Sequence, residues 1–279
     1  MERAAGLRDA TRRRFLKRGV ALGAALAASV VRAAGGQSAA PVPDDPSRVL
    51  GNPMRPYGDR SRFVTSVRIA HGGRPSPDNF GLVFHVASPL QDSVGIITPS
   101  SLHFVGTTRG SYIPEIDPKE HRLLIHGEVD RPLTFTMEDL KRFPSVTRVH
   151  FMECAGNRTS RRAKTVQESH GMTSCAEWTG VLLSVLFKEC GVKSGASWFV
   201  AEGSEEVKGA SSIPIAKGMD DCFVAYGMNG EALRPQQGFP LRLMVPGFEG
   251  IFHTKYLRRI KIVERYYMNY NDFGHLDKE

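Results

Sequence analysis

The sequence predicts an α+β fold built from mixed sheets with few helices. Strand patterns outnumber helical patterns along the chain and do not alternate with them, which argues against a doubly wound parallel sheet. Of the 279 residues, 41% are apolar and 24% are charged, close to the averages of globular proteins. No internal repeat is visible, and a chain of this length can bury a substantial core.

Residues 1–34 carry the pattern of a twin-arginine signal peptide. Arg12 and Arg13 stand in the stretch Thr-Arg-Arg-Arg-Phe-Leu-Lys, and an uncharged, alanine-rich run follows from Val20 to Val31. This run is shorter than the roughly 20 residues that span a bilayer, so a signal peptide is favoured over a stable membrane anchor or an ordinary basic helix. We therefore expect a periplasmic protein, exported folded and loaded with a cofactor beforehand.

Charge and cysteine content exclude several kinds of partner and cofactor. The net charge is +8, but residues 1–34 hold eight basic and two acidic residues, which leaves only +2 for the rest. Nucleic-acid binding is therefore not expected. The four cysteines form no Cys-x-x-Cys pair, which disfavours zinc ribbons and iron–sulfur clusters, and no Cys-x-x-Cys-His motif predicts a haem in this chain. A disulfide among Cys175, Cys190 and Cys222 stays open.

The expected elements follow in order within one domain. Residues 35–62, rich in Gly, Pro, Ser and Asp, predict a linker, residues 63–279 the domain, and residues 79–118 long loops broken by Gly and Pro. A helical turn is expected at 137–142 before Pro144, a helix at 181–190 that ends at Gly191, and a hairpin turn at Asn229-Gly230. Strands are expected at 121–126, 133–136, 146–153, 198–201, 222–226, 241–245 and 256–263.

The most informative motif begins where one of these strands ends. Cys154 follows the strand 146–153 and opens the sequence Cys-Ala-Gly-Asn-Arg, where a sharp turn can project a side chain into a cleft. An isolated cysteine is more often a small buried hydrophobe. This stretch, however, resembles the loop of the sulfite oxidase family that presents the one protein ligand to molybdenum. A soft thiolate suits a metal already held by the sulfurs of a pterin dithiolene.

Two further landmarks carry the same resemblance, which is closest to the sulfane dehydrogenases within the family. Residues 170–181 contain Glu-Trp-Thr-Gly-Val, which the family places at the opening of a helix. Residues 237–260 contain Gln-Gly-Phe-Pro-Leu-Arg and Val-Pro-Gly-Phe-Glu-Gly, and Arg242 and Lys255 keep the family's thirteen-residue spacing. The similarity runs from about Ile97 to about Met268 and implies a sulfite-oxidase-like fold that binds molybdenum-molybdopterin.

The resemblance also implies roles for individual residues. Arg242 and Lys255 would meet the pterin's terminal phosphate through charge-assisted bonds. The whole expected cofactor-binding set is Phe104, Thr107, Thr108, Gln237, Arg242, His253, Thr254 and Lys255. Cys154 would be the metal ligand, and Arg158, Arg109 and Tyr270 would act on the substrate.

This chain departs from the family pattern in three places. Where the family has Phe-Val-Arg-Asn-His, this chain has Gly106 in place of the active-site arginine, unless Arg109 or another group replaces that charge. The active-site tyrosine corresponds either to Tyr270 or to Phe273. The family continues into an immunoglobulin-like C-terminal dimerisation domain, which we expect this sequence to lack, either because the sequence is truncated or because it is a single-domain member such as the exported methionine-sulfoxide reductases.

The expected activity is oxidation of a small sulfur oxyanion such as sulfite, or of a sulfane sulfur carried on a protein. The electrons would pass to a c-type cytochrome. Two alternatives stay open: reduction of sulfoxides such as methionine sulfoxide, and a non-catalytic family member that has lost its activity.

Overall fold

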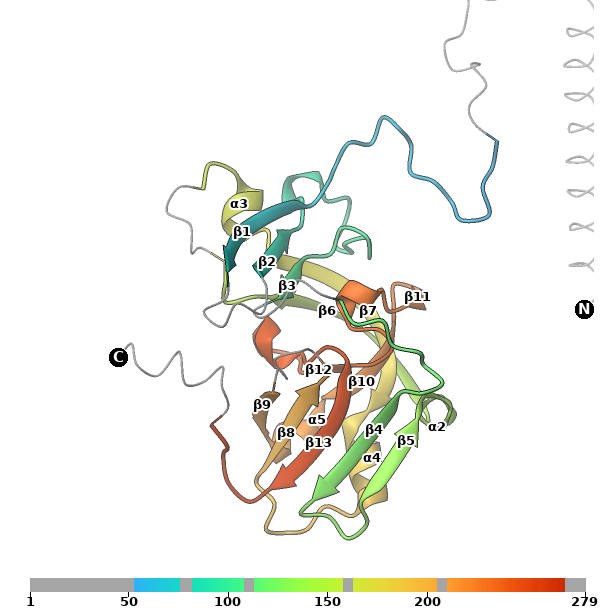
Figure 1. The fold of residues 1–279 in the computed structure, drawn as a ribbon, viewed down its shortest axis with the longest axis vertical. Helices are drawn as coiled ribbons and strands as arrows, with labels where there is room; N and C mark the ends of the chain where they lie inside the picture. Colours follow the sequence, from blue (N-terminus) through green and yellow to red (C-terminus); the bar gives the residue numbers. More distant parts are fainter. Residues whose placement is uncertain (1–52, 76–81, 108–112, 158–162, 205–209, 269–279) are drawn as a thin grey trace, which may run out of the picture. The chain divides into compact units, whose positions relative to one another are not determined.

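The computed structural model describes residues 53–75, 82–107, 113–157, 163–204 and 210–268 (Figure 1). Residues Arg62–Glu279 form one compact unit, distinct from the residues before it. The expected signal peptide lies outside the described residues, and the expected linker is described only from residue 53 onward. Among the described residues, no helix is both long and apolar enough to cross a membrane.

The first sheet is small, and two of its three strands lie in a region where sequence analysis expected only loops. Its antiparallel strands follow the order β1-β2-β3, with bounds Ile69–Pro75, Leu82–Ala87 and Val105–Thr107. The expectation of long loops across residues 79–118 was therefore wrong for β2 and β3. These strands are short and are joined by distant pairing, such as Phe84 with Thr107, which leaves little local pattern to recognise.

The second sheet holds the strand that leads to Cys154. It follows the order β11-β10-β7-β6, and β12 also pairs with β10, all antiparallel. The bounds are Ser145–Glu153 for β6, Thr173–Leu182 for β7, Phe223–Met228 for β10, Glu231–Ala232 for β11 and Arg242–Met244 for β12. Asn229 and Gly230, both at positive φ, make the expected hairpin turn between β10 and β11.

The Glu-Trp-Thr-Gly-Val landmark lies within β7, so its expected place at the opening of a helix was wrong. The helix α4 begins only at Leu183 and runs to Cys190. Gly180 is needed in the strand because a Cβ there would lie 2.0 Å from the carbonyl oxygen of Val224 on β10. The landmark glycine therefore allows the two strands to pair closely. At the other end of α4, Gly191 has a φ of 69° and caps the helix as expected.

The third sheet is mixed and confirms the α+β class. Its order is β5-β4-β13-β8-β9, in which β13 and β4 are parallel and the other pairs antiparallel. The bounds are Arg122–Gly127 for β4, Leu133–Thr136 for β5, Trp198–Gly203 for β8, Ala210–Pro214 for β9 and Leu257–Val263 for β13.

The remaining helices are short and begin at side-chain caps in two cases. Thr136 and Asp139 form a capping box at α2 (Met137–Arg142), which was expected, and Thr165 and Glu168 form one at α3 (Val166–His170), which was not. The other helix is α5 (Ile215–Asp220), and the 3-10 turns are η2 (Leu90–Asp92), η3 (Pro235–Gln237) and η4 (Gly250–Phe252).

Two apolar clusters form the core. The larger one packs α4, through Leu186 and Phe187, against strands of the second and third sheets. The smaller one surrounds the fully buried Trp178 and includes Phe104, Met152 and Met172. Met152 precedes Cys154 by two residues, so the smaller cluster packs against the end of β6.

Candidate active site

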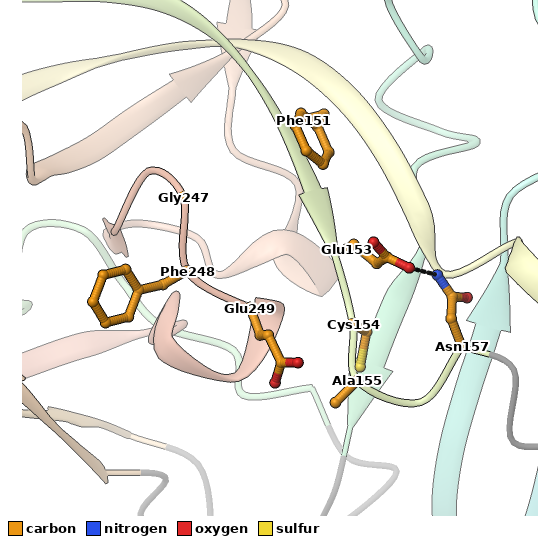
Figure 2. Close-up of a pocket in the computed structure, with 8 residues that line it drawn as sticks. All are labelled: Phe151, Glu153, Cys154, Ala155, Asn157, Gly247, Phe248 and Glu249. Atoms are coloured by element: carbon orange, nitrogen blue, oxygen red, sulfur yellow. Dashed lines mark hydrogen bonds between the residues drawn. The ribbon is translucent and has the colours of Figure 1, made fainter.

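Cys154 lies just past the C-terminal end of β6, as expected, in a turn closed by backbone hydrogen bonds. Its N–H donates to the Met172 carbonyl at 3.0 Å, and the Asn157 N–H donates to the Cys154 carbonyl at 3.0 Å. The side chain lies at a pocket of about 340 Å³ (Figure 2). The residues that line this pocket are Phe151, Glu153, Cys154, Ala155, Asn157, Gly247, Phe248 and Glu249.

Asn157 ties this turn to the start of β7. Its amide nitrogen donates to a Glu153 carboxylate oxygen at 3.0 Å and to the Thr173 hydroxyl at 2.8 Å, and its carbonyl oxygen accepts from the Met172 N–H at 2.9 Å. The asparagine of Cys-Ala-Gly-Asn-Arg therefore links the turn to β7 through hydrogen bonds. It fixes where the Cys154 side chain emerges.

The thiol of Cys154 is held in its neutral form in the absence of a cation. Burial raises its pKa, the Gly156 N–H opposes this by pointing at the sulfur at 3.5 Å, and the carboxylates of Glu249 and Glu153 raise it further. A bound metal ion would displace the thiol proton, because its positive charge outweighs these effects.

Three glycines surround Cys154 and leave room beside its sulfur. A Cβ on Gly106 would lie 3.8 Å from the Cys154 sulfur, and one on Gly156 would lie 3.7 Å from it. A Cβ on Gly250 would lie 3.6 Å from the Cys154 Cβ. Gly106 also has no positive φ, so its backbone conformation is one that other residues can adopt. The backbone therefore does not require a glycine at position 106, and the missing side chain leaves space beside the thiol.

A buried arginine lies next to Met152, near the end of β6. Arg242, on β12, is only 2% exposed. Its guanidinium donates to the Gln237 carbonyl at 2.9 Å, the Gln237 side-chain oxygen at 3.3 Å and the His253 carbonyl at 3.3 Å. It also contacts the Met152 sulfur at 3.6 Å and lies 4.8 Å from the centre of the Trp178 ring. The guanidinium is thus oriented by neutral groups and by an aromatic face.

Gln237 and Phe104 join this network. The Gln237 amide donates to the Phe104 carbonyl at 2.9 Å, and the Phe104 N–H donates to the Ser174 hydroxyl at 3.0 Å. The Phe104 ring stacks on His103, whose burial lowers its pKa to about 3 and keeps the imidazole neutral. The structure therefore brings Phe104 together with Gln237 and Arg242, although Phe104 is 133 positions from Gln237 in the sequence.

His253 forms hydrogen bonds to the backbone of the loop that leads to Glu249. Its Nδ1 accepts from the Val245 N–H at 3.3 Å, so its Nε2 is the donor to the Phe248 carbonyl at 3.1 Å. Burial, followed by the charge of Arg242, lowers its pKa to about 3. Both ring nitrogens therefore bind backbone. Its role toward a cofactor stays a prediction.

Thr254 and Lys255 follow on the same segment. Thr254 is buried, and its carbonyl accepts from the Leu243 N–H at 2.8 Å. The half-buried Lys255 has its amine 5.4 Å from the centre of the Tyr256 ring. The segment is thereby held against β12, which carries Arg242.

Four expected site residues lie outside the described residues: Arg109, Arg158, Thr108 and Tyr270. Thr107 ends β3 without a described side chain. Conversely, sequence analysis did not single out Glu153, Asn157 or Glu249, which all line the pocket. Asn157 and Glu249 stand inside the landmarks already recognised, but their proximity to one thiol depends on tertiary structure.

Comparison with known proteins decides the family. The sequence profile of the oxidoreductase molybdopterin binding domain matches residues 110–271, more than half of the chain. The chain belongs to this family. The match confirms the resemblance to sulfite oxidases drawn from the sequence landmarks, and it includes Cys154, Gln237, Arg242 and Lys255, whereas Phe104 and Gly106 precede it.

Relatives of two kinds show the similarity of this chain to proteins of known activity. The crystal structure of the sulfane dehydrogenase SoxCD from Paracoccus pantotrophus superimposes with a TM-score of 0.72 and 36% identity, over 78% of this chain and 57% of that one. An NADH nitrate reductase from Volvox carteri is 36% identical over 198 residues, 64% of this chain and 23% of that enzyme. For an NADPH nitrate reductase from Phytophthora infestans the values are 36%, 203 residues, 67% and 22%. The chain thus spans less than a quarter of these nitrate reductases.

Proposed function

We propose that this protein oxidises a sulfur centre, either sulfite or a sulfane sulfur bound to a protein. The observation that carries the proposal is the combination of one thiol, Cys154, at an open pocket with a fold that matches a sulfane dehydrogenase over 78% of the chain. Addition of one oxygen atom from water to the sulfur releases two protons and two electrons. The electrons would pass to a c-type cytochrome.

The described residues fit a molybdenum–pterin cofactor. Cys154 offers a soft ligand with space around its sulfur. Arg242 and Gln237, which are buried, offer oriented hydrogen-bond donors. When bound, this cofactor would supply the oxygen-atom transfer and accept the electrons. We assign the metal to Cys154 and the pterin phosphate to Arg242 and Lys255, with Phe104, Gln237 and Thr254 beside them.

The protein's own contribution is placement. Asn157 holds the Cys154 turn on β7, and the pair of His253 bonds holds residues 245–248 opposite it. The Cys154 turn and the loop at residues 245–248 are thus both fixed in position next to the pocket. Arg109, Arg158 and Tyr270 are further proposed substrate residues.

One set of measurements separates this function from its competitors. The similarity to nitrate reductases favours nitrate reduction as the second candidate. Metal analysis of the purified full chain tests cofactor binding, and steady-state assays with sulfite, thiosulfate, nitrate and methionine sulfoxide test the reaction. Oxidation of a sulfur compound is expected. A molybdenum-loaded protein that only reduces nitrate or the sulfoxide would refute the proposal, and a protein that binds no molybdenum would indicate a non-catalytic member.

Export to the periplasm is proposed from the arginine pair. Replacement of Arg12 and Arg13 by lysine keeps the positive charge of the segment but removes the pair itself. We expect the precursor to stay in the cytoplasm, as measured by fractionation and immunoblotting. Unchanged periplasmic accumulation would contradict the assignment of the signal.

The space beside Cys154 predicts the effect of restoring a family arginine. A side chain at position 106 would start at ordinary contact distance, 3.5 Å from the Met172 methyl carbon, so Gly106→Arg should fold. A guanidinium near the thiol should tighten sulfite binding about tenfold if about 1.4 kcal/mol is gained. The measurement is KM for sulfite at equal molybdenum content, with Gly106→Gln as the uncharged control. An equal gain from both variants would show that charge is not the cause.

A further inference from the structure

The described charged side chains that line the pocket are both acidic. One Glu153 oxygen accepts a hydrogen bond from the Asn157 amide at 3.0 Å, so this carboxylate also serves the turn. Glu249 is exposed, and Figure 2 shows its carboxylate directed toward Cys154 and Ala155, while the Phe248 ring points away. Glu249 is thus the described carboxylate that faces an incoming molecule at the thiol.

Glu249 and Cys154 line the same pocket, and the Glu249 carboxylate is directed toward the thiol (Figure 2). A negative charge at this place disfavours a free anion that approaches the thiol, because charges of the same sign repel. Sulfite is an anion at neutral pH, so Glu249 opposes its binding.

The lining of the pocket points in the same direction. Phe151, which lines the pocket and is 68% exposed, adds an apolar wall suited to a longer substrate.

We infer that Glu249 is a specificity-determining residue: its carboxylate disfavours small free oxyanions and favours a sulfur group carried on a peptide that brings positive charge to the pocket. This inference rests on the proposed function and chooses between its two substrates. Glu153 supports the same preference but also holds Asn157, which makes it a poorer position to test.

Sulfate binding tests the electrostatic part without any turnover. Calorimetric titration of the cofactor-loaded full chain with sulfate compares the wild type, Glu249→Gln and Glu189→Gln, the last being an exposed glutamate in the final turn of α4. Glu249→Gln should bind sulfate about fivefold more tightly, as expected for the loss of one unit charge several ångströms away in a partly solvated site. Glu189→Gln should match the wild type. Equal sulfate affinity in all three proteins would overturn the inference.

A pair of peptides tests the substrate preference. Both carry a cysteine persulfide, flanked by lysines in one peptide and by glutamates in the other, and kcat/KM is measured with the wild type and Glu249→Gln. The wild type should prefer the lysine peptide, and Glu249→Gln should lose about fivefold of that preference. A preference that survives the substitution would overturn the inference. If sulfate binding changes as expected but no sulfur compound is oxidised by any loaded variant, the proposed function fails and the role of Glu249 in anion exclusion stands.

Discussion

Cys154→Ser is expected to lower turnover by at least about a thousandfold while most of the pterin stays bound. The serine hydroxyl is nearly isosteric but is a hard oxygen ligand, which suits a metal held by dithiolene sulfurs poorly. Pterin retention is expected because the proposed phosphate contacts, Arg242 and Lys255, lie on a different segment from Cys154. The measurements are kcat with sulfite, molybdenum content and pterin content, each per mole of protein.

Cys175→Ser is the matched control for this experiment. Cys175 is half-buried on β7, directly opposite Phe151 on β6, and therefore close to the same strand end without lining the pocket. We expect near-normal turnover in Cys175→Ser. Near-normal activity in Cys154→Ser, together with a loss in Cys175→Ser, would show that the ligand has been assigned to the wrong thiol.

Much of the site-bearing fold was predictable because its signals are local. The observed bounds of β5 and α2 are those expected, since the alternating strand is followed by a Thr136 cap and the helix stops before Pro144. Cys154 was placed correctly because the alternation of β6 ends one residue before it. The predicted start of the helix at Val181 was wrong, because an apolar residue there fits both the end of a strand and the start of a helix.

The parts that the sequence could not predict depend on distant segments. The approach of Glu249 to Cys154 requires that η4 pack against the end of β6, where a Cβ on Gly250 would lie 3.3 Å from the Glu153 carbonyl oxygen. The contact between Gln237 and Phe104 joins residues that are 133 positions apart. Local periodicity carries no information about such contacts, which explains why the acidic character of the pocket was not foreseen.

Arg242→Met should lose the cofactor, in contrast to Cys154→Ser. Methionine keeps the length and the packing against Trp178 but removes the donors that bind the Gln237 and His253 carbonyls. Loss of a charge-assisted bond to a phosphate costs about 1.5–3 kcal/mol, which corresponds to a roughly 10- to 150-fold weaker affinity. We therefore expect pterin and molybdenum contents to fall together by at least about tenfold, measured on protein purified without added cofactor.

Loss of stability alone could also empty the site, because unpaired buried carbonyls cost about 1–3 kcal/mol each. Arg259→Met is the control for this effect: Arg259, on β13, bonds the Glu202 carboxylate within the third sheet and belongs to no proposed cofactor contact. Thermal unfolding of the cofactor-free forms shows how far each variant is destabilised. If the two variants unfold at similar temperatures and only Arg242→Met lacks pterin, the buried guanidinium binds the cofactor. Equal pterin contents at equal stability would show that Arg242 serves the core alone.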